Sequence, residues 1–291
     1  MWMQDGTPLS IAAAGYHAQI AAQAGGRVAR FFRQGRHGSV ELLRPWDGTG
    51  FDAHTWPKAG AFPMLPFTNR LSTQGLQLDG RVAKGVHGTQ GYPLHGLGLR
   101  RKWLVKHHSA DQVELELDHS GQCEEWPWRF RALQTFHLTE DGLAWTLTVE
   151  NRDTVRMPLA MGWHPYCSVD SDCRISDPEH ARRFDMDDSG TAVPDQGTAG
   201  VGVRAGATVA YDQWDGQFNM PGPAGGRLCL QASGLGALVM HRSVRGDYLC
   251  VEPVTALPGR LAAHTDDPAL WTAPGAQRQI SVLISYTGAC I

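Results

Sequence analysis

The sequence predicts an all-β protein, built as a large antiparallel β-sandwich. Apolar and polar residues alternate with a period of two in several segments, and no segment of about ten or more residues shows the periodicity of a helix. The 34 glycines and 17 prolines are scattered evenly, so they indicate short strands separated by turns and mark no linker between domains. We therefore expect residues 1–291 to form a single domain.

The expected strands follow one another along the chain. Alternation is clearest at 113–118 and 143–150, where every second residue is apolar, as in a strand with one buried face. The segment 130–138 precedes the second of these, and the turn at 140–142 joins the two as a hairpin. The other expected strands are 16–22, 28–32, 227–232, 237–241, 248–252 and 279–286. Residues 177–206 are expected to form a long loop over the surface.

Composition argues against several classes of function. The chain is 42% hydrophobic and 19% charged, as globular proteins are, and its net charge of −3 gives no electrostatic basis for binding nucleic acid or an anionic membrane. It has no run of about 18 apolar residues that would indicate a membrane span. The alanine-rich stretch 11–26 lacks the preceding basic residues of an export signal. Six cysteines without a CxxC pair or a dense cluster indicate reduced thiols and a cytoplasmic location.

Four segments place a polar or titratable residue beside glycine or proline in apolar surroundings. They are 62–70 (FPMLPFTNR), 93–103 (PLHGLGLRRKW), 161–166 (MGWHPY) and 248–258 (YLCVEPVTALP). Alternate residues of a strand share a face, so His164 projects from a face kept open by Gly162. Pro165 and Pro253 cannot donate to a β-ladder, and we expect each of them to end its strand.

Each of these residues also has an ordinary structural interpretation. His164 is consistent with a histidine that bonds to backbone at the edge of the core, and Glu252 with an ion-pair partner of an arginine. His95 fits a solvated turn, and Asn69–Arg70 fits a surface loop held by two prolines. The tryptophans offer stacking faces for a sugar, although most tryptophans in a β protein are core residues.

Taken together and in this order, the four segments resemble the aldose 1-epimerase (galactose mutarotase) family. That family has an Asn-Arg motif after a proline-rich strand, a His-Gly motif, a Gly-x-His-Pro-Tyr motif and a Glu-Pro motif near the C-terminus. A fifth segment, 214–218 (WDGQF), is similar to the family's Asp-x-x-Phe segment. Each motif alone is weak, whereas five in the right order over about residues 60–260 are a strong signal.

The resemblance implies a galactose-mutarotase-like super-sandwich with the sugar in an open cleft. It also implies an isomerase of carbohydrate metabolism whose catalytic residues are Glu252 as general base, His164 as general acid and His95 as a second histidine near the ring oxygen. Exchange of α and β anomers requires that the anomeric hydroxyl lose a proton while the ring oxygen gains one. We expect the acid and the base on opposite sides of the hemiacetal, with neighbouring carboxylates raising the pKa of His164 above about 6.5. This chemistry requires no metal and no other cofactor.

The resemblance further implies that Arg70 and Asp215 bind the hydroxyls of a small-molecule sugar, with Asn69 in support. The sequence departs from the family pattern at Cys167, where an aromatic residue is common, and at 257–260 (LPGR) after the Glu-Pro motif. Both departures bear on the identity of the sugar. The basic run 100–102 is compatible with a phosphorylated or acidic sugar, and also with a solvated strand end.

Two other functions remain open at this point. One is a non-catalytic carbohydrate-binding protein of the same fold, although the presence of both His164 and Glu252 favours catalysis. The other is a metal-dependent enzyme with a cupin-type barrel and the ligands His87, His95, His164 and Glu252, although these lie far apart in sequence and form no His-x-His pair. The assembly state, monomer or homodimer, also remains open.

Overall fold

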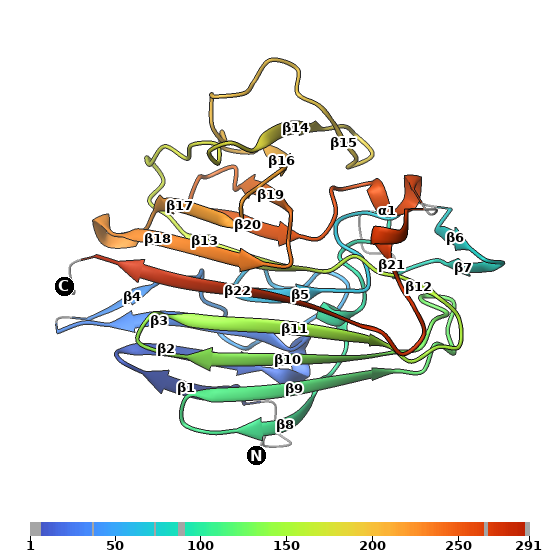
Figure 1. The fold of residues 1–291 in the computed structure, drawn as a ribbon. Helices are drawn as coiled ribbons and strands as arrows, with labels where there is room; N and C mark the ends of the chain where they lie inside the picture. Colours follow the sequence, from blue (N-terminus) through green and yellow to red (C-terminus); the bar gives the residue numbers. More distant parts are fainter. Residues whose placement is uncertain (1–6, 37, 73, 87–90, 265–266, 289–291) are drawn as a thin grey trace.

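A computed structural model describes residues 7–36, 38–72, 74–86, 91–264 and 267–288, and it confirms the predicted antiparallel all-β architecture (Figure 1). The larger sheet consists of β1 (Leu9–Ala13), β2 (Tyr16–Ala21), β3 (Arg27–Gln34), β4 (Ser39–Glu41), β5 (Ala61–Met64), β13 (Gly162–Ser168), β14 (Arg182–Met186), β15 (Ala192–Pro194), β16 (Thr208–Asp212), β19 (Ala237–Arg242) and β20 (Tyr248–Val254). The smaller sheet consists of β8 (Leu104–His108), β9 (Gln112–His119), β10 (Phe130–Leu138), β11 (Leu143–Asn151), β17 (Gln217–Pro221), β18 (Arg227–Ser233) and β22 (Gln277–Thr287).

The remaining elements are short. Two two-stranded pairs lie outside the large sheets: the hairpin of β6 (Leu76–Leu78) with β7 (Arg81–Ala83), and the pair of β12 (Met157–Pro158) with β21 (Trp271–Thr272), which are distant in sequence. Helical turns in the described part of the chain are α1 (Arg260–Ala263) and the 3-10 turns η1 (Ala22–Ala24), η2 (Gly98–Arg100), η3 (Pro223–Gly225) and η4 (Pro268–Leu270). None of the described helices is long and apolar enough to cross a membrane.

The strand order explains which segments meet. The eleven-stranded sheet runs β1-β2-β3-β5-β13-β20-β19-β16-β14-β15, with β4 paired to β3, and the seven-stranded sheet runs β17-β18-β22-β11-β10-β9-β8. Strand β13 therefore lies between β5 and β20, although the three strands are distant in sequence. This pairing brings three of the four motif segments side by side.

The two sheets pack face to face through large aromatic side chains. Trp145 of β11 stacks on Trp163 of β13 with ring centroids 5.0 Å apart, and both side chains are fully buried. Trp145 Nε1 donates a hydrogen bond of 2.8 Å to Gln134 Oε1, and Gln134 Nε2 donates to the carbonyl of Gly26. The buried amide of Gln134 is thus satisfied at both ends, as a polar group in a core must be.

Two expectations about strand ends are wrong. Strand β13 continues past Pro165 to Ser168, and β20 continues past Pro253 to Val254. The reason lies in the register: the ladder between β13 and β20 pairs Gly162 with Val254 and resumes only at Tyr166 with Cys250, so neither proline has to donate within the gap. Gly162 is needed there because a Cβ would lie 2.7 Å from the Pro253 carbonyl oxygen.

The expectation of one long surface loop at 177–206 is also wrong. This segment contains β14 and β15, which pair with each other and extend the edge of the eleven-stranded sheet through β16. Both strands are short and half-exposed, so they lack the alternation that identified the longer strands. One core cluster draws residues from Leu9 to Tyr286, which supports our proposal that the chain forms a single domain.

Candidate active site

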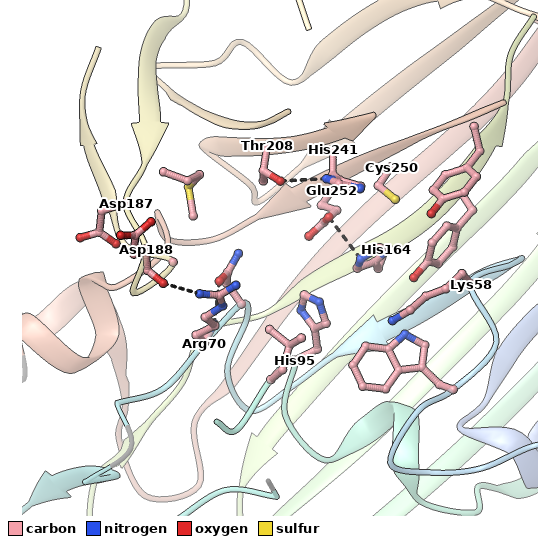
Figure 2. A pocket seen from close by; sticks show the side chains of 17 residues that line it. Lys58, Arg70, His95, His164, Asp187, Asp188, Thr208, His241, Cys250 and Glu252 are labelled. Atoms are coloured by element: carbon pink, nitrogen blue, oxygen red, sulfur yellow. Dashed lines mark hydrogen bonds and ion pairs between the residues drawn. The ribbon is translucent and has the colours of Figure 1, made fainter. Parts of the chain in front are cut away.

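A cavity of about 530 Å³ lies on the face of the eleven-stranded sheet that points away from the Trp145–Trp163 contact. Strands β13, β14, β16, β19 and β20 contribute side chains to it, and the loops around 56–58, 69–70, 94–95 and 187–190 supply the rest of its lining (Figure 2). Its size is that of a site for a small ligand.

His164 and Glu252 contact each other inside this cavity. His164 lies on β13 and Glu252 on the neighbouring β20, and Nε2 of the imidazole is 3.2 Å from Oε1 of the carboxyl group. Both side chains are about 95% buried, so they reach solvent only through the cavity. We expected acid and base on opposite sides of a bound sugar; the structure instead places them in direct contact.

His95 completes a group of three titratable side chains. Its ring meets that of His164 edge to face, with centroids 4.9 Å apart. The segment around it turns sharply: His95 has a φ of 61°, and Gly96 packs so closely that a Cβ would lie 2.1 Å from the Leu65 carbonyl oxygen. The His95 N–H donates to the Asn69 carbonyl at 2.9 Å, so two of the motif segments hold each other in place.

Burial sets the protonation of this group. It raises the pKa of Glu252 from 4.5 to about 8, against the opposing effect of the nearby Lys58 ammonium. Burial also lowers the pKa of His95 and His164 well below 6.5, and the charge of Lys58 adds to this effect. The structure therefore favours a lowered pKa for His164 over the upward shift that we expected, because burial and the neighbouring His95 and Lys58 act against its charged form.

Arg70 and Asn69 line the cavity as expected. The Arg70 guanidinium lies over the ring of Tyr92 at 4.0 Å, and its Nη1 donates to the Asp188 carbonyl at 2.9 Å. Asn69 Oδ1 accepts a hydrogen bond of 2.8 Å from the Arg70 backbone N–H. These contacts leave the remaining guanidinium N–H groups available to a ligand.

Asp215 does not belong to this site. It lines a different, shallow depression together with residues of β11, β18 and β22 on the seven-stranded sheet. Its Oδ1 accepts a hydrogen bond of 2.9 Å from the Gln217 backbone N–H, which is the geometry of an Asx turn ahead of β17. The expectation that Asp215 contacts the same sugar as Arg70 is corrected: the Asp-Gly pair of the WDGQF segment forms a turn.

The cavity also contains residues that the sequence did not single out. Lys58 comes from the loop before β5, and Asp187 and Asp188 come from the turn after β14; Trp56, one of the tryptophans considered as a stacking face for a sugar, lies in the same loop as Lys58. His241 of β19 shares a hydrogen bond of 2.8 Å with the Thr208 hydroxyl. Nothing in the sequence around Lys58 marks it, because it lies in a loop without periodicity. Cys250 does line the cavity, as its shared face with Glu252 predicts.

The three titratable groups are close enough to share one metal ion. Ligand atoms of His95, His164 and Glu252 all lie within 4.8 Å of one another. Two features disfavour a cation there. The Nδ1 atoms of both histidines lack a hydrogen-bond acceptor among the described residues, although metal-bound histidines normally have one, and the Lys58 ammonium lines the same cavity. The fourth ligand of the cupin alternative, His87, lies outside the described residues, and the two open sheets do not form a cupin-type barrel.

Comparison with known proteins agrees with the fold and the motifs. The chain is 33% identical over 154 residues to the uncharacterized protein YphB of Escherichia coli K12, a match that covers 52% of this chain and about half, 49%, of that protein. Among solved structures, a candidate aldose 1-epimerase from Escherichia coli K12 superposes with a TM-score of 0.82 at 22% identity, over 97% of this chain and 99% of the other. A galactose mutarotase-like protein from Clostridium acetobutylicum gives 0.77 at 18% identity, over 96% and 94%.

These similarities confirm the galactose-mutarotase-like fold. The sequence of residues 9–192 matches the aldose 1-epimerase family directly. This range includes the Asn-Arg, His-Gly and Gly-x-His-Pro-Tyr motifs, so the match covers three of the motif segments as well as more than half of the chain. The chain belongs to the aldose 1-epimerase family.

Proposed function

We propose that this protein is a mutarotase that exchanges the α and β anomers of an aldose bound in the cavity. The observation that carries the proposal is the contact of 3.2 Å between His164 Nε2 and Glu252 Oε1 inside a solvent-connected cavity of about 530 Å³. A cavity of this volume accommodates a monosaccharide. The pair supplies a proton donor and a proton acceptor, which are the two groups that ring opening requires.

The pair works as one unit that holds a single proton at neutral pH. Because burial raises the pKa of Glu252 and lowers that of His164, the resting proton is on Glu252, in contact with the imidazole. Transfer across this contact gives the carboxylate and imidazolium form. Both forms have the same total number of protons, so they titrate together.

Ring opening converts the carboxylate and imidazolium form of the pair into the carboxylic acid and imidazole form. The Glu252 carboxylate accepts the proton of the anomeric hydroxyl while the His164 imidazolium donates a proton to the ring oxygen, and the C1–O5 bond breaks. The two sugar oxygens are attached to the same carbon, which is why an acid and a base in direct contact can serve both. The aldehyde rotates about C1–C2, and the reverse transfers close the ring on its other face. No proton is gained or lost over the cycle.

The neighbouring residues position the sugar. His95 is neutral, lines the cavity and has its ring against that of His164, which places it beside a bound sugar. Arg70 lies across the cavity from Lys58 (Figure 2) and offers guanidinium N–H groups to hydroxyls, with Asn69 beside it. In this assignment Glu252, His164 and His95 are catalytic, and Arg70 and Asn69 bind substrate.

Exchange NMR on equilibrated aldoses tests the proposal. Magnetisation transfer between the two anomeric signals should accelerate on addition of the protein, and the double variant His164→Asn, Glu252→Gln should give only the buffer rate. A protein that binds a sugar in calorimetry without accelerating exchange of any aldose is a carbohydrate-binding protein, and the mutarotase proposal is then wrong.

We further propose a cytoplasmic setting, supported by the free thiols of the cysteines that the structure describes.

A further inference from the structure

Three cations lie around the aromatic pair of Trp56 and Phe62 at one end of the cavity. The ammonium nitrogen of Lys58 lies 3.9 Å from the ring centroid of Trp56, and the guanidinium carbon of Arg100 lies 5.0 Å from the same ring. The Arg27 guanidinium lies 5.3 Å from the ring centroid of Phe62, which packs edge-on against Trp56. Phe62 in turn stacks on the imidazole of His164, so the cluster directly adjoins the catalytic pair.

Among the described residues no carboxylate is in contact with any of these three charges, although the exposed Asp52 carboxylate interacts electrostatically with Arg100. Arg27 and Arg100 are more than 90% buried, and their hydrogen bonds go to backbone carbonyl oxygens. Nη2 of Arg27 and Nε of Arg100 have no hydrogen-bond partner among the residues that the structure describes. Within the described part of the chain, neither these arginines nor Lys58 forms an ion pair. Buried cations without an ion-pair partner, as Arg27 and Arg100 are, are costly, so this arrangement calls for a function.

The two arginines remain charged under physiological conditions. Burial lowers the pKa of each to about 10, which is still well above neutral pH. Lys58 differs from them because its side chain is exposed to the cavity, and Figure 2 shows its ammonium group directed toward His95 and His164. The arginines therefore supply a positive field from behind, and Lys58 is the cation that a ligand can touch.

The acidic residues of the cavity lie elsewhere. Asp187 and Asp188 are on the far side of it from Lys58, next to Arg70 (Figure 2). Glu252, on which the Lys58 charge acts, has its pKa raised to about 8 by burial and is protonated at neutral pH. The cavity is thus positive at the end with Lys58 and acidic at the other.

We propose that the substrate is an aldose with an anionic group, a carboxylate or a phosphate on carbon 6, which pairs with Lys58. The inference rests on the proposed mutarotase function and adds the substrate class. Carbon 6 is attached to C5, which is bonded to the ring oxygen O5. Its acidic group therefore lies close to O5, at the end of the sugar where His164 and Glu252 open the C1–O5 bond. An ammonium group suits either anion as a point charge, and the field of the buried arginines strengthens the pairing.

A different role for Lys58 makes a different prediction. Its charge lowers the pKa of Glu252, so it could act on the catalytic pair alone. In that case its loss would change the exchange rate of neutral and anionic sugars by the same factor. A cation that pairs with the substrate changes the two rates differently, and the ratio between them is the decisive quantity.

The test compares D-glucose, D-glucuronate and D-glucose 6-phosphate by exchange NMR with the wild type, Lys58→Met and Lys106→Met. Lys106 is the matched control, since it is an exposed lysine on β8 that pairs with Glu116 on the other sheet. We expect kcat/KM of the wild type to be at least about tenfold higher for one anionic sugar than for glucose, and Lys58→Met to reduce that ratio about tenfold or more. Preference for glucuronate identifies the carboxylate, and preference for glucose 6-phosphate the phosphate.

Two results would overturn the inference: a wild type that prefers glucose, or a Lys58→Met variant that lowers all three rates equally. A third result would overturn it too: if Lys106→Met reduced the preference for the anionic sugar as much as Lys58→Met does, the preference would depend on the net charge of the protein and not on Lys58. If no sugar is exchanged, the mutarotase proposal fails, and titration calorimetry still tests the anion site. Anionic sugars that bind more tightly than glucose to the wild type but not to Lys58→Met support it, and equal binding of all three refutes it.

Discussion

The seven-stranded sheet and the central strands of the eleven-stranded sheet use burial in different ways. In β11 of the smaller sheet, buried and half-exposed residues alternate over the whole strand. In β13 of the larger sheet, the six residues from Gly162 to Cys167 are all buried. The first sheet has one face on the core and one in water. The strands β5, β13 and β20 have the core on one face and the cavity with its aromatic lining on the other.

The buried amide of Gln134 and the two histidines of the cavity differ in a similar way. Gln134 in the smaller sheet has both ends of its buried amide in hydrogen bonds. His95 and His164 in the cavity each keep a buried Nδ1 without a partner among the described residues. Satisfied polar groups stabilise a fold, whereas unsatisfied ones cost free energy until a ligand engages them. We therefore expect substitutions in the first region to affect stability and those in the second to affect activity.

The largest effect is expected from Trp145→Ala. This change removes the stack on Trp163 and leaves Gln134 Oε1 without its donor, so the free energy of unfolding should fall by about 3–5 kcal/mol. Urea denaturation followed by tryptophan fluorescence measures it. Trp145→Phe retains most of the apolar contact and serves as the control, with a smaller loss. A cost below about 1 kcal/mol for the alanine variant would mean that this contact does not hold the sheets together.

Glu252→Gln should lower activity and leave the stability of the fold intact. Its exchange rate should fall about a hundredfold or more, because glutamine cannot carry the proton of the catalytic pair. Its stability should be equal to or above that of the wild type near pH 8. The carboxyl group has its pKa raised from 4.5 to about 8 on folding, so its cost to stability is absent below pH 4.5, grows as the pH rises, and is complete above about 8.

Exchange NMR and thermal unfolding at pH 4 and pH 8 check both halves of this prediction. The stability difference between Glu252→Gln and wild type should shrink toward zero at pH 4. Near-native turnover of the variant would exclude Glu252 from the reaction. A variant that unfolds much more easily than the wild type at pH 8 would instead place Glu252 among the residues that stabilise the fold.

The pH–rate profile sharpens the assignment of the pair. Since one shared proton is needed, kcat/KM should decrease about tenfold per pH unit above an upper limb near pH 8, as Glu252 loses its proton. The lower limb should lie well below pH 6.5, where His164 gains a second proton. A rate that keeps rising from pH 8 to pH 9.5 would contradict the shared proton and indicate a carboxylate that acts only as a base.

Local sequence predicted the scaffold better than the site. The alternation at 130–138 and 143–150 located β10 and β11 to within one residue, because a strand half-covered by the core must alternate. It could not show that β13 pairs with β20 across Pro165 and Pro253, since this depends on register between distant segments. The contact between His164 and Glu252 follows from that pairing, and the pKa of the carboxyl group is raised because the side chain is buried there.

Lys58 and Asp215 show two ways in which sequence motifs fail to locate a site: no motif marks Lys58, and a motif match places Asp215 wrongly. Lys58 lies in a loop where no pattern marks it, and its position in the cavity comes from the path of the chain before β5. Asp215 matches the family's Asp-x-x-Phe segment, yet the following glycine lets its carboxylate close on the Gln217 N–H as a turn. A short motif gives the residue type, whereas the backbone conformation decides where its side chain goes.

The smallest effect is therefore expected from Asp215→Ala. The carboxylate lies on the seven-stranded sheet, outside the cavity, so kcat/KM for exchange should stay within about twofold of the wild type. Loss of the hydrogen bond to Gln217 should lower the free energy of unfolding by about 0.5–1.5 kcal/mol. Arg70→Met is the matched comparison, because it removes a charge that lines the cavity and should lower kcat/KM about tenfold. If Asp215→Ala lost activity as Arg70→Met does while remaining folded, the sugar would have to reach both sheets, and the division between scaffold and site would not hold.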